Sequence, residues 1–161
     1  MTIKEIQEEI IRLKKEKDFK KADRIELWKN YWLEYVNAFD KLTNILPKSI
    51  VTAYTGRQAI ELGFKYLLVQ KDVKEGELKT HDLKKLSDLL NSKNIFAEEY
   101  MEEIPDFCEK YCQMIEGENV EYFRYPEYGK NTYFAGNQLD IEWLSYNFAL
   151  IILKLLHLVK L

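Results

Sequence analysis

Apolar residues recur at intervals of three and four along most of the chain, which places them on one face of an α-helix. At the N-terminus this pattern predicts an amphipathic helix over residues 1–17. Its narrow apolar stripe consists of Ile3, Ile6, Ile10 and Leu13. A second helix is predicted from about residue 24, and Pro47 ends it, because proline disfavours the helical conformation of the residue before it. The apolar positions of this helix are Trp28, Trp32, Tyr35, Phe39 and Leu42.

Two further helices are predicted in the middle of the chain. The third covers residues 49–70, and the fourth begins in the stretch "THDLKKLSDLL". The inward-facing positions of the fourth helix are expected to be Leu83, Leu86 and Leu90. Thr80 is expected to cap this helix, because a threonine oxygen there accepts a hydrogen bond from a free amide of the first turn. His81 would then lie in that first turn, and we interpret it as structural in preference to catalytic.

The C-terminal half continues the helical pattern around one long interruption. Residues 96–115 keep helical spacing, and Pro105 either kinks this segment or starts a new helix. Residues 117–138 are rich in aromatic side chains and are predicted to form a loop, and the last helix is predicted over residues 140–160. The fold is therefore expected to be all-α, with one domain and a single antiparallel bundle of about five helices over residues 24–160.

The composition agrees with a compact chain of this kind. Its 161 residues suit one domain, and an apolar content of 47% is sufficient for one core. The formal net charge of −3 gives no overall attraction to nucleic acid. The N-terminus shows no export signal, and the apolar stretch "NFALIILKLLHLVKL" is shorter than a membrane span and contains Lys154. We expect a cytoplasmic protein in which this stretch is a buried helix or a dimer interface and not a membrane anchor.

Residues that could bind a metal or a cofactor are scarce. The chain has two cysteines, Cys108 and Cys112, and two histidines, His81 and His157. The cysteines are four residues apart on one helical face, where we expect buried reduced thiols, and a zinc site would need two further ligands. No glycine-rich phosphate loop and no Ser-His-Asp set is recognisable. The sequence therefore predicts no metal and no cofactor.

A row of charged residues lies along the third predicted helix. Arg57, Glu61 and Lys65 are spaced by four residues, which places them on one ridge beside the apolar face. They could form two helix-stabilising ion pairs, worth about 0.2–0.5 kcal/mol each. They could instead line a cleft between helices, where bundles place ligand sites. We treat all three as candidate ligand-binding residues, together with His81.

The aromatic-rich loop contains further candidates. Arg124 lies in the stretch "VEYFRYPEYGKNTYFAG", and Tyr128 follows four residues later. An arginine among aromatic rings can bind phosphates and bases. The same arginine could instead fold the loop onto the bundle through cation–π contacts. Arg124 and Tyr128 are therefore candidate ligand-binding residues whose alternative role is structural.

Three segments resemble the HEPN superfamily of small helical bundles. The stretch "RQAIELGFKYLLVQKD" contains Glu61 and Lys65, and "THDLKKLSDLL" follows it after a variable loop, as in that family. The element "FRYP" at residues 123–126 is similar to an Arg-Tyr-Pro element found after the third helix of several members. The resemblance covers about residues 54–126 and rests on the order and spacing of these parts.

The resemblance implies an activity that can be checked against the sequence. Many HEPN proteins are metal-independent ribonucleases, in which an Arg and a His separated by four to six residues act across a dimer. The arginines here are Arg12, Arg24, Arg57 and Arg124, and none is followed by a histidine at that spacing. Cleavage by the family route would lack its general acid and base. We therefore expect a protein without ribonuclease activity of its own.

The resulting hypothesis is a non-catalytic HEPN-type binding module that forms a homodimer through its apolar C-terminal helix. The resemblance implies two settings. One is a partner or substrate-presenting subunit for a separate enzyme such as a nucleotidyltransferase. The other is an RNA- or nucleotide-binding regulator in a defence or toxin–antitoxin system. The alternative hypothesis is a metal-independent ribonuclease with an atypical site, which requires His81 and Arg124 to meet in the fold or across a dimer.

Overall fold

The computed structural model describes residues 2–16, 23–98, 101–117, 123–124, 127–128, 132–133 and 139–160. These residues are mainly helical, so the prediction of an all-α fold is confirmed. The elements in chain order are α1 (Ile3–Glu16), α2 (Arg24–Ile45), α3 (Ile50–Gln70), the 3₁₀ helix η1 (Glu75–Lys79), α4 (Leu83–Ser92), α5 (Glu103–Tyr111), the π-helical turn η2 (Cys112–Glu116), β1 (Glu127–Tyr128), β2 (Thr132–Tyr133) and α6 (Ile141–Leu158).

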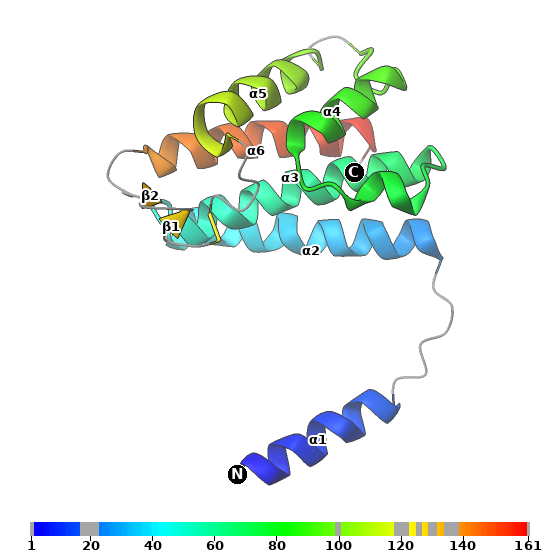
Figure 1. The fold of residues 1–161 in the computed structure, drawn as a ribbon, viewed down its shortest axis with the longest axis vertical. Helices are drawn as coiled ribbons and strands as arrows, with labels where there is room; N and C mark the ends of the chain where they lie inside the picture. Colours follow the sequence, from blue (N-terminus) through cyan, green and yellow to red (C-terminus); the bar gives the residue numbers. More distant parts are fainter. Residues whose placement is uncertain are drawn as a thin grey trace.

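The helices α2 to α6 form the bundle, and α3 is at its centre. α3 packs against α2, α4 and α6, while α5 packs against α4 (Figure 1). Most residues of α3 are buried, as expected for a helix that is surrounded on several sides. α1 lies apart from the bundle, at the N-terminal end of the chain (Figure 1). Among the described residues, the bundle thus contains five α-helices, in line with the prediction.

Two glycines allow α3 to approach its neighbours closely. A Cβ atom at Gly63 would lie 2.8 Å from Nε1 of Trp32 on α2 and 2.9 Å from Cδ1 of Leu155 on α6. A Cβ atom at Gly56 would lie 2.5 Å from the ring of Phe39. The three neighbouring side chains are buried in the core. The glycines therefore set how tightly α3 packs against α2 and α6.

The start of α4 differs from the prediction. The helix begins at Leu83, and its N-cap is Asp82, whose carboxylate accepts hydrogen bonds from the amides of Lys84 (2.9 Å) and Lys85 (3.2 Å). The prediction of Thr80 as the cap was wrong, because Thr80 accepts a hydrogen bond from the amide of Asp82 (3.2 Å) and so shapes the turn before the helix. The expected inward face is confirmed by the complete burial of Leu83, Leu86 and Leu90.

The segment after α4 contains a separate helix and a small hairpin. α5 begins at Glu103, so Pro105 lies in its first turn, and the second of the two predicted outcomes, a new helix, is observed. The turn η2 follows, and Gly117 ends it with a positive φ of 59°. β1 and β2 pair antiparallel in the segment predicted as a loop. Strands of two residues are too short to leave an alternating pattern in the sequence.

Candidate functional site

The charged row on α3 lies inside the bundle. Arg57, Glu61 and Lys65 expose only 2%, 4% and 7% of their side chains. Both ion pairs of the first interpretation are present, because Glu61 contacts the cation one turn before it and the cation one turn after it. Their burial means that the small energies measured for exposed helix pairs do not apply to them.

Arg57 is the centre of a hydrogen-bond network that joins three elements. Its Nε donates to Oε1 of Glu116 on η2 at 2.6 Å, and its Nη2 donates to the other oxygen of that carboxylate at 3.3 Å. Nη1 donates to Glu61, and Nη2 also donates to the backbone carbonyl of His81. Burial lowers the pKa of Arg57, but the hydrogen bond to Glu116 and the charges of Glu116 and Glu61 outweigh burial and raise it. One guanidinium therefore ties together α3, η2 and the turn before α4.

Glu61 connects Arg57 to the edge of the network. Its Oε1 accepts a hydrogen bond from Nζ of Lys65 at 2.7 Å and lies 2.8 Å from Nδ1 of His81. Burial acts to raise the pKa of Glu61, but the charge of Arg57 and the hydrogen bond from Lys65 outweigh burial and lower it. Glu61 is therefore ionised at neutral pH and acts only as a hydrogen-bond acceptor.

Two members of the network, Glu116 and Tyr111, were not predicted from the sequence. The hydroxyl of Tyr111 donates to Oε1 of Glu116 at 2.7 Å. Burial, followed by the charge of Glu116, raises the pKa of Tyr111 well above its ordinary value. The two residues are five positions apart, a distance that the π-helical turn brings together and that α-helical spacing does not. The available signal was a glutamate that directly follows the apolar helix of residues 96–115.

The buried charges of this network balance one another. Arg57 and Lys65 are its cations, and Glu61 and Glu116 are its carboxylates. Buried ions are tolerated when they are paired and hydrogen-bonded, whereas removal of one partner leaves an uncompensated charge. These four side chains offer no unpaired charge to a ligand, so their arrangement supports a structural role.

His81 is the member of the network that solvent reaches. Its side chain is 62% exposed, while its Nδ1 faces Glu61. Because an ionised carboxylate only accepts hydrogen bonds, Nδ1 donates, and in a neutral ring Nε2 is then the acceptor. A carboxylate that orients an imidazole in this way is an arrangement used for proton transfer. His81 is therefore the point at which this network could contact a substrate or ligand.

The two candidates from the aromatic loop lie elsewhere. Arg124 is exposed and lines a surface pocket of about 340 Å³ near Tyr54 of α3, and the described residues that line this pocket do not include His81. Tyr128 lies in β1 of the hairpin. Residues 125–126 of the "FRYP" element lie outside the described residues. The structure thus brings Arg57, Glu61, Lys65 and His81 together in one network. Arg124 instead lines a surface pocket that His81 does not line.

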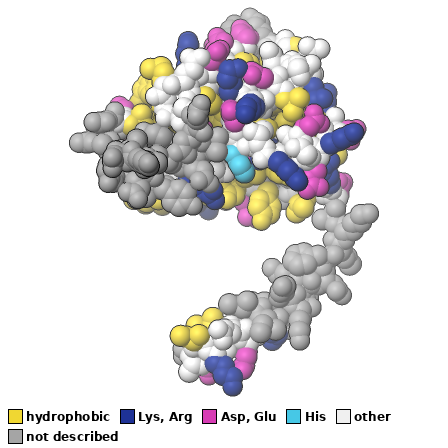
Figure 2. Space-filling model, viewed as in Figure 1, with side chains coloured by type: hydrophobic (Ala, Val, Ile, Leu, Met, Phe, Trp, Pro, Cys, Tyr) yellow, Lys and Arg dark blue, Asp and Glu magenta, His cyan; other side chains and the backbone are white. Residues whose placement is uncertain are grey.

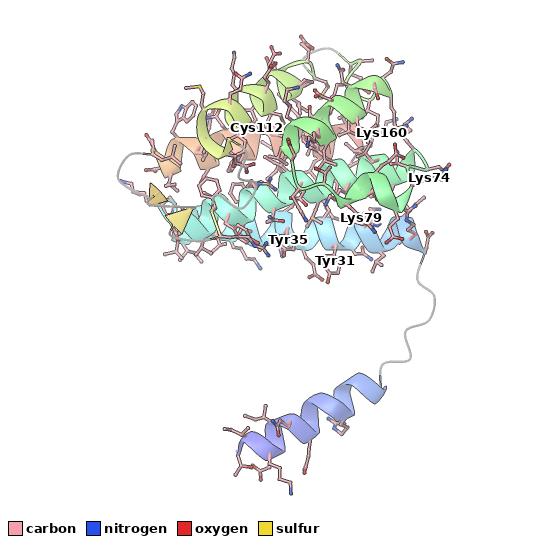
Figure 3. The ribbon with its side chains drawn as sticks, viewed as in Figure 1. Tyr31, Tyr35, Lys74, Lys79, Cys112 and Lys160 are labelled. Atoms are coloured by element: carbon pink, nitrogen blue, oxygen red, sulfur yellow. The ribbon has the colours of Figure 1, made fainter. Side chains whose placement is uncertain are left out.

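The two cysteines are free thiols with little reactivity. Cys108 is buried on α5, and Cys112 is partly buried at the start of η2 (Figure 3). Burial is the main cause that raises the pKa of both thiols, to about 11 for Cys112. Neither thiol is therefore a thiolate at neutral pH. Within the described part of the chain, no group of three or more His, Cys, Asp or Glu side chains is placed to hold a metal ion.

A different kind of surface lies on α6. Four large apolar side chains of this helix face solvent, namely Trp143 (59% exposed), Tyr146 (63%), Leu150 (40%) and Leu153 (60%). We call this row the α6 seam. The other side of α6 contributes Phe148 and several aliphatic residues to the core. α6 has the length and the mean hydropathy, 1.3, of a membrane-spanning helix, a test that the core helices of soluble proteins also pass.

Comparisons with models of known protein families, with curated proteins and with solved structures gave no match. The HEPN resemblance therefore rests on the motifs in the sequence. The function has to be inferred from the two features described above, which are the closed charged network and the exposed α6 seam.

Proposed function

We propose that this chain is a non-catalytic binding module of HEPN type, an antiparallel helical bundle that works as a homodimer through α6. The observation that supports this best is the α6 seam. A row of large apolar side chains exposed on one helix is typical of an interaction surface. The closed network on α3 supports a structural role for the charged candidates, which leaves binding to other surfaces.

The spacing of the α6 seam favours a second helix as its partner. Its four members are separated by intervals of three, four and three residues, which is the alternation found in coiled-coil interfaces. Phe148 and Ile151 lie on the core side of α6, so the seam points away from the bundle. One helix packed along the seam would cover all four side chains.

The α6 seam is also symmetric about its midpoint, which favours a second copy of the same chain. If two α6 helices pack antiparallel about residue 148, Trp143 lies opposite the partner's Leu153. In the same register, Tyr146 lies opposite the partner's Leu150. A two-fold interface requires this reciprocity, because each contact must occur twice with the roles exchanged.

The charges at the ends of the α6 seam favour the same register. Antiparallel packing about residue 148 places Glu142 opposite the partner's Lys154, so that charges of opposite sign meet. A parallel pairing would place Glu142 beside Glu142 of the partner subunit. Within one chain Lys154 contacts Glu103 (Nζ to Oε2, 2.8 Å) and Glu142 contacts Lys48 (Oε2 to Nζ, 3.7 Å), so the contacts across the dimer would add to these ion pairs.

Sedimentation equilibrium of the full chain tests the dimer directly. We expect a dimer at micromolar concentration and a monomer for Leu150→Glu, because the substitution places two carboxylates in the middle of the interface without partners. The matched control is Leu27→Glu, which changes an exposed leucine on α2 away from the seam. A wild-type chain that stays monomeric at tens of micromolar would refute the proposal.

Disulfide trapping tests the register. In chains in which Cys112 is replaced by serine, Tyr146→Cys protomers mixed with Leu150→Cys protomers should form the mixed disulfide in preference to either self-pair. A parallel dimer would instead favour the two self-pairs. A non-reducing gel with protomers of two lengths separates the three products.

The contact between His81 and Glu61 supports a second candidate function, a metal-independent ribonuclease with an atypical site. Labelled structured RNA incubated with the protein in a chelator would report cleavage and retention on one gel. Our proposal predicts intact RNA. Cleavage that is lost in His81→Ala or Arg124→Ala but kept in His157→Ala, an exposed histidine near Glu98 (3.9 Å), would establish the enzyme instead.

The surface charge favours a protein as the further partner of the dimer. Basic and acidic side chains are interspersed on the face shown in Figure 2, whereas nucleic-acid-binding surfaces typically gather basic residues in one patch. The HEPN resemblance supports a separate enzyme such as a nucleotidyltransferase as that partner, within a defence or toxin–antitoxin system. Retention of intact RNA in the assay above would favour an RNA-binding role instead.

A further inference from the structure

α1 lies apart from the bundle (Figure 1), and it carries an apolar stripe. Ile3 and Ile6 are both exposed, and Ile10 and Leu13 continue the stripe by their spacing. An isolated helix of 14 residues is marginal in water and gains stability mainly by packing its apolar face. α1 therefore has a stripe suited to packing against an apolar surface.

The bundle offers an apolar groove between α2 and α6. Its volume is about 580 Å³. The apolar residues that line it are Leu33, Val36, Phe39, Ile152, Leu153 and Leu156. The groove continues into a smaller pocket of about 260 Å³, because Thr43 and Ala149 line both. An amphipathic helix laid in such a groove buries its stripe and covers the exposed apolar wall.

We propose that α1 folds back antiparallel to α2 of the same chain and packs the apolar residues of its first turn, Ile3 and Ile6, into the end of this groove near Val36. α1 ends at Glu16 and α2 begins at Arg24, so seven residues connect them. That length lies within the two to eight residues that usually join packed helices in bundles. α1 is about 21 Å long at 1.5 Å per residue, so its first turn would reach the part of α2 near Val36 and Asn37.

Disulfide formation within the full chain tests the proposal. With Cys112 replaced by serine, the pair Ile3→Cys and Asn37→Cys should form an intramolecular disulfide much faster than the control pair Glu8→Cys and Asn37→Cys, because Glu8 lies on the opposite face of α1. Equal rates for the two pairs would overturn the proposal. A disulfide that forms only between two chains would also overturn it, since the groove would then hold α1 of the partner.

Substitutions in the stripe separate specific packing from random encounter. Adding Ile6→Glu to the Ile3–Asn37 cysteine pair should slow disulfide formation severalfold, whereas adding Glu8→Gln should leave the rate unchanged. No slowing by Ile6→Glu would mean that the stripe does not hold α1 in the groove. Leu153 belongs both to this groove and to the α6 seam, so the test is repeated in Leu150→Glu, which removes the α6 contact at a residue that does not line the groove. The disulfide rate should be unchanged in this variant.

Discussion

The charged row of α3 and the outer face of α6 both depart from the usual distribution of side chains, in which charges are exposed and large apolar groups are buried. On α3, Arg57, Lys65 and their two carboxylates are held inside the bundle, whereas on α6 four large apolar side chains face solvent. Each buried charge is paired within the chain, so the first region is complete in one copy. The apolar row has no such compensation, so the second region is complete only when another surface covers it.

The charged network on α3 therefore concerns the stability of a single chain, whereas the α6 seam concerns the association of two chains. The spacing of the charged row left two roles open, namely helix-stabilising ion pairs and ligand contacts in a cleft between helices. The pairing partners favour the first role, since Glu116 and Tyr111 close the network from the side of η2. The apolar residues of α6 left open a buried helix or a dimer interface, and the exposure of one row of them favours the interface. Substitutions in each region can therefore show whether that region depends on one chain or on two.

The largest effect is expected for Arg57→Met. The substitution leaves Glu61 and Glu116 buried without their shared cation and should lower the free energy of unfolding by about 3–5 kcal/mol. Urea denaturation of the purified variant measures this. The control is Lys84→Met, which breaks an exposed pair with Asp88 (2.7 Å) and should change stability by less than about 1 kcal/mol. Equal effects of the two substitutions would show that the buried network on α3 contributes no more to stability than an exposed ion pair does.

A smaller loss is expected for Gly63→Ala, which tests the packing beside the charged network. The new methyl group would lie 2.8 Å from Nε1 of Trp32, so the core must shift, and overpacking of this kind costs about 1–3 kcal/mol. Thermal unfolding compared with Gly76→Ala provides the control, because a Cβ atom at Gly76 has no neighbour within 4 Å. An unchanged melting temperature for Gly63→Ala would show that α2 and α3 can move apart without loss of stability.

The order and number of helices were predictable, because the apolar period of an α-helix is visible in one sequence. The burial of Arg57 was not predictable, because charged residues spaced by four positions also occur on exposed helices. The pairing of Tyr111 with Glu116 depends on a π-helical turn that local spacing does not encode. The N-cap of α4 is Asp82, whereas Thr80 was predicted. Both residue types suit an N-cap, and only the backbone conformation distinguishes the two positions.

The pH dependence of stability also tests the charged network, with a smaller expected effect than that of Arg57→Met. The pKa of Glu61 is lower in the folded chain than its ordinary value of 4.5. Its ionised form therefore contributes stability above that ordinary value, and the contribution is lost as the pH falls through the folded pKa. Wild type should lose stability relative to Glu61→Gln as the pH falls below 4.5. Urea titrations at several pH values measure the difference, and parallel curves for the two proteins would contradict it.

The smallest effect on a single chain is expected for Leu150→Glu, and this result separates the two regions most clearly. An exposed substitution changes the stability of a monomer by within about 0.5 kcal/mol, so at nanomolar concentration the variant and wild type should unfold together. At high concentration only the wild type should gain stability, because association favours the folded state by mass action. Arg57→Met should show the opposite behaviour, with a loss that is already present at nanomolar concentration. A concentration-independent loss in Leu150→Glu would mean that the α6 seam supports its own bundle and not a second copy.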